Sequence, residues 1–212
     1  MKKLVISLLA ASMLFAGGGD ILRAQFLADR FELAKGGDKI WDINAFVGYD
    51  LNKFYIYSEG ENSESQNELV YSHAISPFWD VQIGAEWDRT EDDGYFALLA
   101  LQGLAPYWIE TKTKLLVGEG AVGIDFDFEY ETLFTQRLIL NSRLETRYFT
   151  STTNGGNYQG LNDIEVGFRL RYEIKREFAP YVGIDFAKNF AKKADVEGGF
   201  DSRAVIGLRF WF

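Results

Sequence analysis

Apolar and polar residues alternate with a period of two over much of this 212-residue chain. In residues 122–134 the even-numbered positions are apolar or threonine, whereas the odd-numbered positions include Asp125, Asp127, Glu129 and Glu131. Residues 161–175 repeat the arrangement, with charged side chains at most odd positions. This period is typical of β-strands, because successive side chains point to opposite faces. Successive charges on one face would destabilise a dry core, so this face must meet water.

The same pattern along the rest of the chain predicts twelve strands, an even number that suits a single-chain bacterial barrel. We expect them near residues 26–35, 40–50, 53–60, 67–76, 78–89, 94–104, 107–118, 121–134, 137–150, 160–175, 179–190 and 201–212. The first is the least regular, because residues 26–33 alternate imperfectly.

The connections between these strands fall into two alternating sets. Polar and often longer segments are predicted at residues 36–39, 61–66, 90–93, 119–120, 151–159 and 191–199, and tight turns separate the other strand pairs. Beyond the N-terminal segment, no run approaches the roughly 18 apolar residues of a membrane helix. Since a bilayer accepts only helices and closed barrels, we expect an all-β fold, a 12-stranded antiparallel transmembrane up-and-down β-barrel. Outer-membrane barrels keep short turns in the periplasm, so both termini are expected there.

The N-terminal segment has the features of a secretory signal peptide. Lys2 and Lys3 precede the apolar run 4–15, and residues 17–19 are glycines. This order of a charged, an apolar and a small-residue region predicts a signal peptide at residues 1–19. One barrel domain is then expected over residues 20–212.

Composition narrows the possible chemistry. The chain has no cysteine, which excludes a disulfide scaffold and a thiolate metal site within it. It has 31 acidic and 22 basic residues, a formal net charge of −9. This balance argues against nucleic acid as a partner and favours contact with cations.

Aromatic residues mark the strand ends and the end of the sequence. Trp79, Trp87, Trp108 and Trp211 lie near strand ends, as expected of an interfacial belt in contact with outer-membrane lipid. The last predicted strand resembles the terminal assembly signal of outer-membrane barrels, in which a glycine precedes spaced aromatic residues. The matching residues are Gly207, Phe210 and Phe212. This resemblance implies recognition by the barrel assembly machinery.

Longer stretches of the chain resemble the copper resistance protein B family. They are Asp50-Leu51-Asn52-Lys53, Glu59-Gly60-Glu61, Tyr71 to Asp80, Gln102 to Trp108, Thr135 to Leu140, Leu170 to Ile174, Arg176 to Gly183 and Arg209 to Phe212. The resemblance implies an outer-membrane barrel that binds copper and contributes to copper tolerance, with a periplasmic copper protein as a possible partner. It also implies that the chain is not an enzyme.

The ligands available for copper are few. Family members typically carry a Met- and His-rich segment ahead of the barrel, whereas here the predicted signal peptide leads almost directly into the first strand. Met1 and Met13 are the only methionines, and His73 is the only histidine. Copper(I) prefers sulfur or imidazole ligands, and copper(II) prefers nitrogen with oxygen. The weak metal candidates are therefore His73 and the carboxylates Asp125, Asp127, Glu129 and Glu131.

His73 shares strand parity with apolar residues and is expected to point outward. An amphipathic side chain at the membrane interface is the simpler interpretation. A barrel lipase resembling outer-membrane phospholipase A would need a serine beside this histidine on the lipid-facing side. Ser72 points to the opposite face, which disfavours that hypothesis.

The four carboxylates of residues 122–134 have two possible roles. They could form a low-affinity cation path, because an acidic ladder attracts cations. Alternatively, a three-residue turn at 135–137 would place Glu129 opposite Arg143 and Asp125 opposite Arg147, forming lumenal charge pairs. The paired arrangement is favoured.

Two functions follow from the sequence. The leading one is copper tolerance at the outer membrane, by copper binding, export or limited permeability. The alternative is a small-solute channel or structural barrel without a metal role.

Overall fold

The computed structural model describes residues 21–90, 93–154, 156–190 and 201–212. The predicted signal peptide and the predicted connection 191–199 lie outside these residues. Within them the chain forms twelve β-strands and one 3₁₀ turn. The strands are β1 (Arg23–Ala34), β2 (Lys39–Gly48), β3 (Asn52–Glu61), β4 (Glu64–Ser76), β5 (Trp79–Arg89), β6 (Gly94–Ala105), β7 (Ile109–Gly118), β8 (Ala121–Leu133), β9 (Leu138–Phe149), β10 (Gly160–Tyr172), β11 (Phe178–Asn189) and β12 (Asp201–Trp211).

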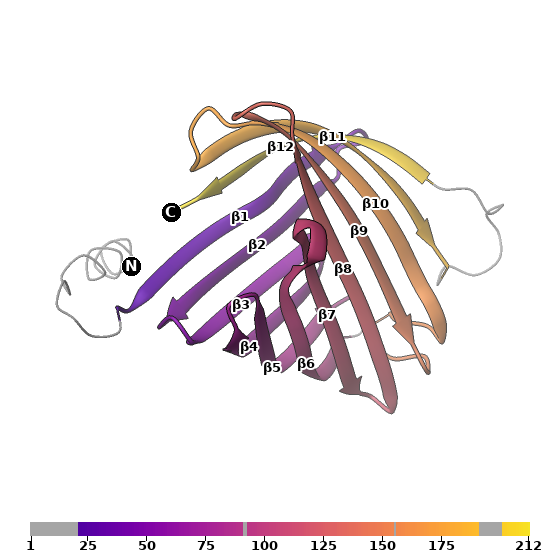
Figure 1. The fold of residues 1–212 in the computed structure, drawn as a ribbon. Coiled ribbons are helices and arrows are strands. Elements are labelled where there is room, and N and C mark those ends of the chain that lie inside the picture. Colours follow the sequence, from indigo (N-terminus) through magenta and orange to yellow (C-terminus); the bar gives the residue numbers. More distant parts are fainter. Residues whose placement is uncertain (1–20, 91–92, 155, 191–200) are drawn as a thin grey trace, which may run out of the picture.

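The strands close into a barrel (Figure 1). Each strand pairs in antiparallel fashion with its neighbours along the chain, and β1 pairs with β12 to complete the ring. At this seam the backbone groups of Phe26 and Phe212 exchange two hydrogen bonds, of 2.9 and 3.0 Å. Closure leaves no strand edge facing lipid, as a transmembrane sheet requires. The predicted twelve-stranded up-and-down barrel is confirmed.

A β-bulge explains why the first strand alternates imperfectly. The register of β1 shifts between Ala28 and Arg30 against β2, and between Ala28 and Glu32 against β12. A bulge inserts one extra residue and re-aims the side chains beside it. Asp29 and Arg30 consequently both reach interior partners, Arg209 and Glu145 respectively.

Strand boundaries differ from the predicted ones by up to three residues, and the differences at two connections have identifiable reasons. The polar residues 61–66 were expected to form a loop, yet β3 and β4 extend until only Asn62 and Ser63 separate them. Polar side chains remain compatible with strand pairing where the barrel protrudes into water. At the other end, Tyr107 and Trp108 form a 3₁₀ turn with Pro106 instead of starting β7. Both have positive φ angles, 67° and 64°, which a strand cannot accommodate.

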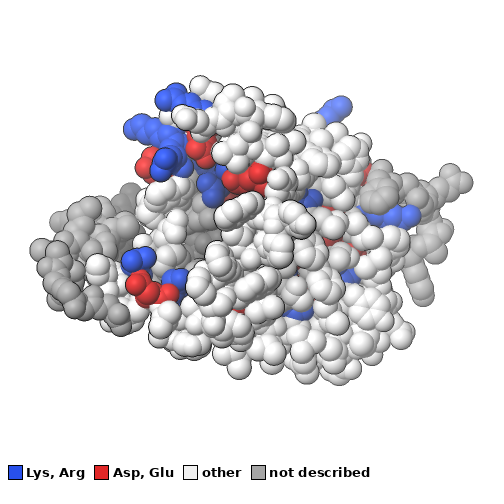
Figure 2. Space-filling model, viewed as in Figure 1, with Lys and Arg blue, Asp and Glu red and all other residues white. Residues whose placement is uncertain are grey.

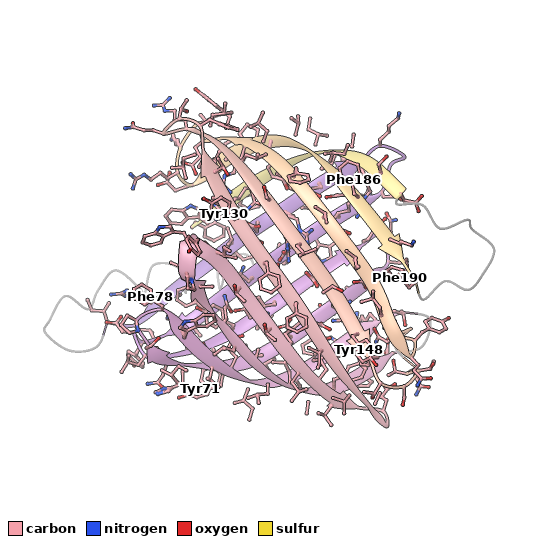
Figure 3. The ribbon with its side chains drawn as sticks, turned by 45° about the vertical axis from the view of Figure 1, so that its right-hand side comes forward. Tyr71, Phe78, Tyr130, Tyr148, Phe186 and Phe190 are labelled. Atoms are coloured by element: carbon pink, nitrogen blue, oxygen red, sulfur yellow. The ribbon has the colours of Figure 1, made fainter. Side chains whose placement is uncertain are left out.

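The outer face is apolar over the strands. Figure 2 shows a mostly uncharged surface, and exposed side chains such as Phe31, Ile83 and Ile206 are about 60% accessible. Aromatic side chains such as Tyr71, Phe78, Tyr130 and Tyr148 lie toward the strand ends (Figure 3), and Trp108 is 74% exposed. A closed barrel with this surface is stable in a bilayer. No helix within the described parts of the chain is both long and apolar enough to span a membrane.

The interior contains an apolar cluster that the sequence analysis did not predict. Its buried members are Val70, Phe96, Leu98, Ala100, Leu116, Ala121 and Phe149. They come from β4 and β6 to β9, so one side of the lumen is packed like a soluble core. The one sequence feature that could have indicated this cluster is the absence of any charged residue in β6.

Candidate functional site

The predicted lumenal charge pairs lie on β8 and β9. The register sets Asp125 opposite Arg147 and Glu129 opposite Arg143. Arg147 Nη2 lies 2.6 Å from Asp125 Oδ2, whereas Arg143 Nε lies 3.4 Å from a Glu129 oxygen. The arginine side chains are only 6% and 8% exposed. These groups are therefore largely buried instead of hydrated.

Arg147 also reaches carboxylates on a distant strand. Its guanidinium lies 2.9 Å from Glu86 and 3.4 Å from Asp88, both on β5. Lys114 on β7 contacts Glu86 at 3.0 Å and Asp125 at 3.1 Å, so the two cations share these acids. Such shared contacts fix the positions of the side chains, because removing any one leaves several buried charges with fewer partners.

Arg143 forms a second centre that crosses the lumen. It donates hydrogen bonds of 3.2 and 2.7 Å to Asp127 on its neighbouring strand. A third bond of 2.8 Å goes to Asp42 on β2, at the opposite side of the barrel. Arg30, re-aimed by the bulge, joins the same group through Glu145, which contacts both arginines. The lumen is thus bridged at this level by side chains of β1, β2 and β9.

Further ion pairs in the lumen involve β10, β11 and β12. Arg169 contacts Glu32 at 3.0 Å and also binds Asp185, while Arg203 contacts Glu61 at 2.6 Å. Glu131, a predicted member of the acidic ladder, pairs with Arg171 at 2.7 Å. This partner comes from β10, two strands away, and sequence reasoning about adjacent strands could not identify it.

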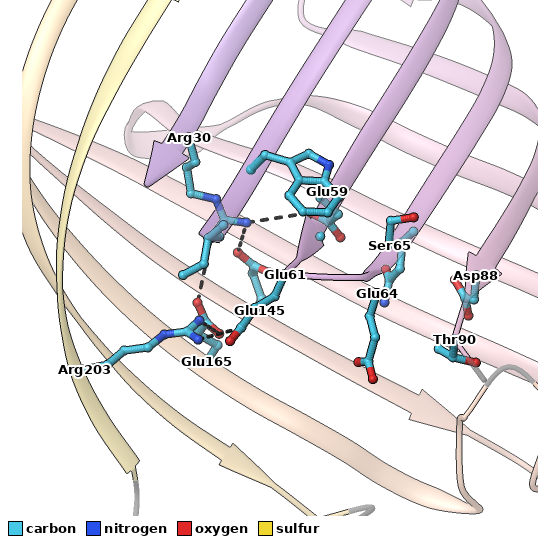
Figure 4. A pocket seen from close by; sticks show the side chains of 14 residues that line it. Arg30, Glu59, Glu61, Glu64, Ser65, Asp88, Thr90, Glu145, Glu165 and Arg203 are labelled. Carbon is cyan, nitrogen blue, oxygen red and sulfur yellow. Dashed lines mark hydrogen bonds and ion pairs between the residues drawn. The ribbon is translucent and has the colours of Figure 1, made fainter. Parts of the chain in front are cut away.

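Space remains beside these bridges. A cavity of about 830 Å³ extends through the lumen and is lined by thirteen carboxylates and seven basic side chains. A smaller cavity of about 220 Å³ lies near the β3–β4 hairpin, at the end opposite the tight turns. Figure 4 shows the second cavity, where Arg30 and Arg203 contact Glu59, Glu61, Glu145 and Glu165. The accessible lumen therefore has an excess of negative charge.

His73 lies away from the lumen. It is exposed on the outer face, and its Nδ1 lies 2.8 Å from the side-chain oxygen of Asn52. Ser72 is buried on the inner face and donates to Asp80 at 3.1 Å. The two side chains are thus on opposite faces and cannot act as a serine–histidine pair.

The described residues do not provide a copper site of ordinary composition. Among them, no group of three or more His, Cys, Asp or Glu side chains has an arrangement that could hold a metal ion. Asp125, Asp127, Glu129 and Glu131 are each engaged with a basic partner. Copper(I) prefers sulfur or imidazole ligands and copper(II) prefers imidazole nitrogen with oxygen, and the described lumen lining has no histidine, methionine or cysteine.

Comparison with known proteins decides the family. A family model described as copper resistance protein B precursor matches residues 22–212. The chain belongs to the copper resistance protein B family. It is 36% identical over 185 residues to copper resistance protein B of Escherichia coli, an alignment that covers 81% of this chain and 62% of that protein. It is 32% identical over 207 residues to a copper resistance protein B homolog of Pseudomonas syringae pv. tomato (strain ATCC BAA-871 / DC3000), covering 90% and 70% of the two chains. The E. coli relative is thus considerably longer than the part matched here.

Solved structures support the fold. The NanC porin superposes with a TM-score of 0.55 at 13% identity, covering 89% of this chain and 99% of that one. The KdgM porin superposes with a TM-score of 0.52 at 12% identity, covering 89% and 98%. At this identity the likeness concerns the fold alone. The family and the barrel fold indicate an outer-membrane protein in contact with lipid.

Proposed function

We propose that this barrel contributes to copper tolerance by limiting the passage of copper ions across the outer membrane. The observation that carries the proposal is the Arg143 bridge, which joins Asp127 on β8 to Asp42 on β2 across the lumen. Together with the Arg147 centre it narrows the path, and both arginine side chains are less than one-tenth exposed. A lumen bridged in this way conducts poorly, because each bridge opens only by separating buried charges.

Tight copper binding by the described barrel is not part of this proposal. The carboxylates are occupied by basic side chains, and His73 faces outward. Copper is the cargo that the barrel restrains, and a periplasmic copper protein is the proposed partner that handles it. The barrel assembly machinery is the proposed partner for insertion. The proposal includes no enzymatic activity.

We also propose that both ends of the described chain face the periplasm. Arg23 and Trp211 lie at the same end of the barrel as the tight turns around Asp50, Phe78 and Gln136. The connection at residues 150–159 lies at the opposite end. Short turns on the periplasmic side are the rule for outer-membrane barrels.

A small-solute channel is the second candidate function. The observation that favours it is the cavity of about 830 Å³, which continues past the bridges and has nearly twice as many acids as bases. Such a lining would select cations.

Growth in copper separates these candidates. A deletion strain should grow less well than wild type at raised copper, and the wild-type gene should restore growth. A gene carrying Arg143→Ser and Arg147→Ser should fail to restore it, because the bridges are lost. The matched control carries Arg23→Ser and Arg89→Ser, which remove two exposed arginines, and should restore growth fully. If the deletion strain grows as well as wild type at raised copper, the tolerance role is excluded and the small-solute channel remains as the candidate function.

A further inference from the structure

Three exposed basic side chains gather on two adjoining turns at the tight-turn end of the barrel. Arg137 lies on the β8–β9 turn, and Lys175 and Arg176 lie on the β10–β11 turn. We call these three residues the turn patch. Figure 2 shows Lys and Arg atoms gathered at upper left, where Figure 1 places these two turns.

One backbone hydrogen bond joins the two turns, and a side-chain bond ties the second turn to β12. The Glu173 amide donates to the Arg137 carbonyl at 2.8 Å, and the Trp211 indole donates to the Arg176 carbonyl at 2.8 Å. The turn patch is therefore carried on a fixed backbone, so ligand binding does not have to order it first.

The charges of the turn patch are not neutralised within the described chain. None of its three side chains has an ion pair there, whereas the neighbouring Glu173 contacts Arg171. Glu177 is the one exposed acidic side chain on these two turns. An excess of positive charge remains at this rim, although the protein as a whole is acidic.

Apolar side chains adjoin the turn patch on the lipid side. Phe134, Ile174 and Phe178 are 59%, 53% and 40% exposed, and they lie within three residues of the basic side chains along the chain. Exposed cations directly beyond a lipid-facing apolar surface are complementary to an anionic phospholipid. The phosphate of such a lipid lies just above its acyl chains. The guanidinium groups can bind phosphate oxygens in bidentate fashion.

We propose that the turn patch binds the headgroup phosphate of an anionic phospholipid, whose acyl chains lie against Phe134, Ile174 and Phe178. The choice of leaflet rests on the proposed function, since periplasmic turns place the patch at the inner leaflet. Continuity with the lipid-facing surface favours a lipid over a soluble acidic protein. A protein would have to displace headgroups from this rim.

Lipid retention by the purified full-length protein tests the proposal. Folded protein in neutral detergent is mixed with phosphatidylglycerol or phosphatidylcholine, and bound lipids are counted by native mass spectrometry. Arg137→Gln with Lys175→Gln and Arg176→Gln removes the patch. Lys35→Gln with Lys39→Gln and Arg89→Gln removes three exposed charges from the opposite rim. We expect the patch variant to bind phosphatidylglycerol at least about tenfold more weakly, and the control variant to bind it like wild type.

Other outcomes would overturn the proposal. If both triple variants lose phosphatidylglycerol binding equally, only net charge matters. If wild type retains the two lipids equally, the headgroup is not recognised. Displacement of phosphatidylglycerol by millimolar inorganic phosphate would indicate a phosphate site without lipid contact. The double variant Phe134→Ser with Ile174→Ser should also weaken retention, and no effect would exclude the acyl contact. Arg137→Lys, which keeps the charge, provides a variant that should fold and still prefer the anionic lipid. Since the assay uses purified protein, its outcome is independent of copper tolerance and of orientation in the cell.

Discussion

Asp125 on β8 and Arg147 on β9 are direct cross-strand partners, and a 2.6 Å contact joins Oδ2 of the aspartate to Nη2 of the arginine. The same arginine contacts Glu86 on β5, so one side chain ties neighbouring and distant strands. A substitution at this arginine therefore affects buried acids on two strands at once.

Arg147→Ser should destabilise the barrel. It leaves Asp88 without its buried ion-pair partner and leaves Asp125 and Glu86 with Lys114 alone. Breaking a buried pair from one side costs about 3–5 kcal/mol. Urea unfolding in a defined lipid or detergent, followed by heat-modifiable migration, measures the loss. Arg89→Ser, at an exposed site, should change stability by less than about 0.5 kcal/mol. Equal stability of the two variants would contradict the buried network.

Removing both lumenal arginines should open the barrel to cations. Arg143→Ser with Arg147→Ser leaves Asp127 and Glu129 without their ion-pair partner and leaves Asp125 with Lys114 alone. An acidic ladder that has lost its arginines draws cations in. We expect higher single-channel conductance and stronger cation selectivity than wild type in planar bilayers. If the wild-type barrel already conducts with strong cation preference, and Asp127→Asn with Glu129→Gln abolishes it, the acids are a working path and the paired interpretation fails.

Copper binding by the purified protein should be weak. The described lumen offers carboxylates already paired with basic groups, and the single histidine is outside it. We expect dissociation constants above the micromolar range for copper(I), measured by competition with a chromogenic chelator. The matched variant is His73→Ala, which should change the affinity little. Sub-micromolar copper(I) binding that survives His73→Ala would show that other ligands exist.

Deleting Phe212 should prevent assembly. Its backbone closes the seam with Phe26, and the two rings stack at 5.2 Å between centroids. We expect the shortened chain to be degraded or left in the periplasm, as judged by heat-modifiable protein in outer-membrane fractions. Phe26→Ala removes the stacking while keeping the terminal signal, and it should assemble. If the deletion assembles at wild-type levels, Gly207, Phe210 and Phe212 are not an assembly signal.

Orientation can be read from labelling, because the chain has no cysteine of its own. Asn154→Cys and Gln136→Cys place single thiols in exposed connections at opposite ends of the barrel. An impermeant maleimide added to intact cells should label residue 154 and leave residue 136 unmodified until the outer membrane is permeabilised. The reverse pattern would place the termini outside.

The sequence by itself determined the strands, the antiparallel closure and the register at the β8–β9 turn. These follow from period-two alternation and turn length, which are local properties of the chain. It did not determine that Arg143 would reach Asp42, that Glu131 would pair with Arg171, or that Arg147 would be 6% exposed. Such contacts join residues from strands that are not adjacent, and only the curvature of the closed barrel brings them together. Cross-strand charge pairs in a water-filled lumen would be partly hydrated and worth about 1 kcal/mol each. The apolar cluster on β4 and β6 to β9 fills part of the lumen, and the shared ion pairs bury one another.

The bulge at Asp29 also divides into a local and a tertiary part. The irregular alternation is visible in the sequence, but only the tertiary structure decides which partners the inward-turned side chains meet.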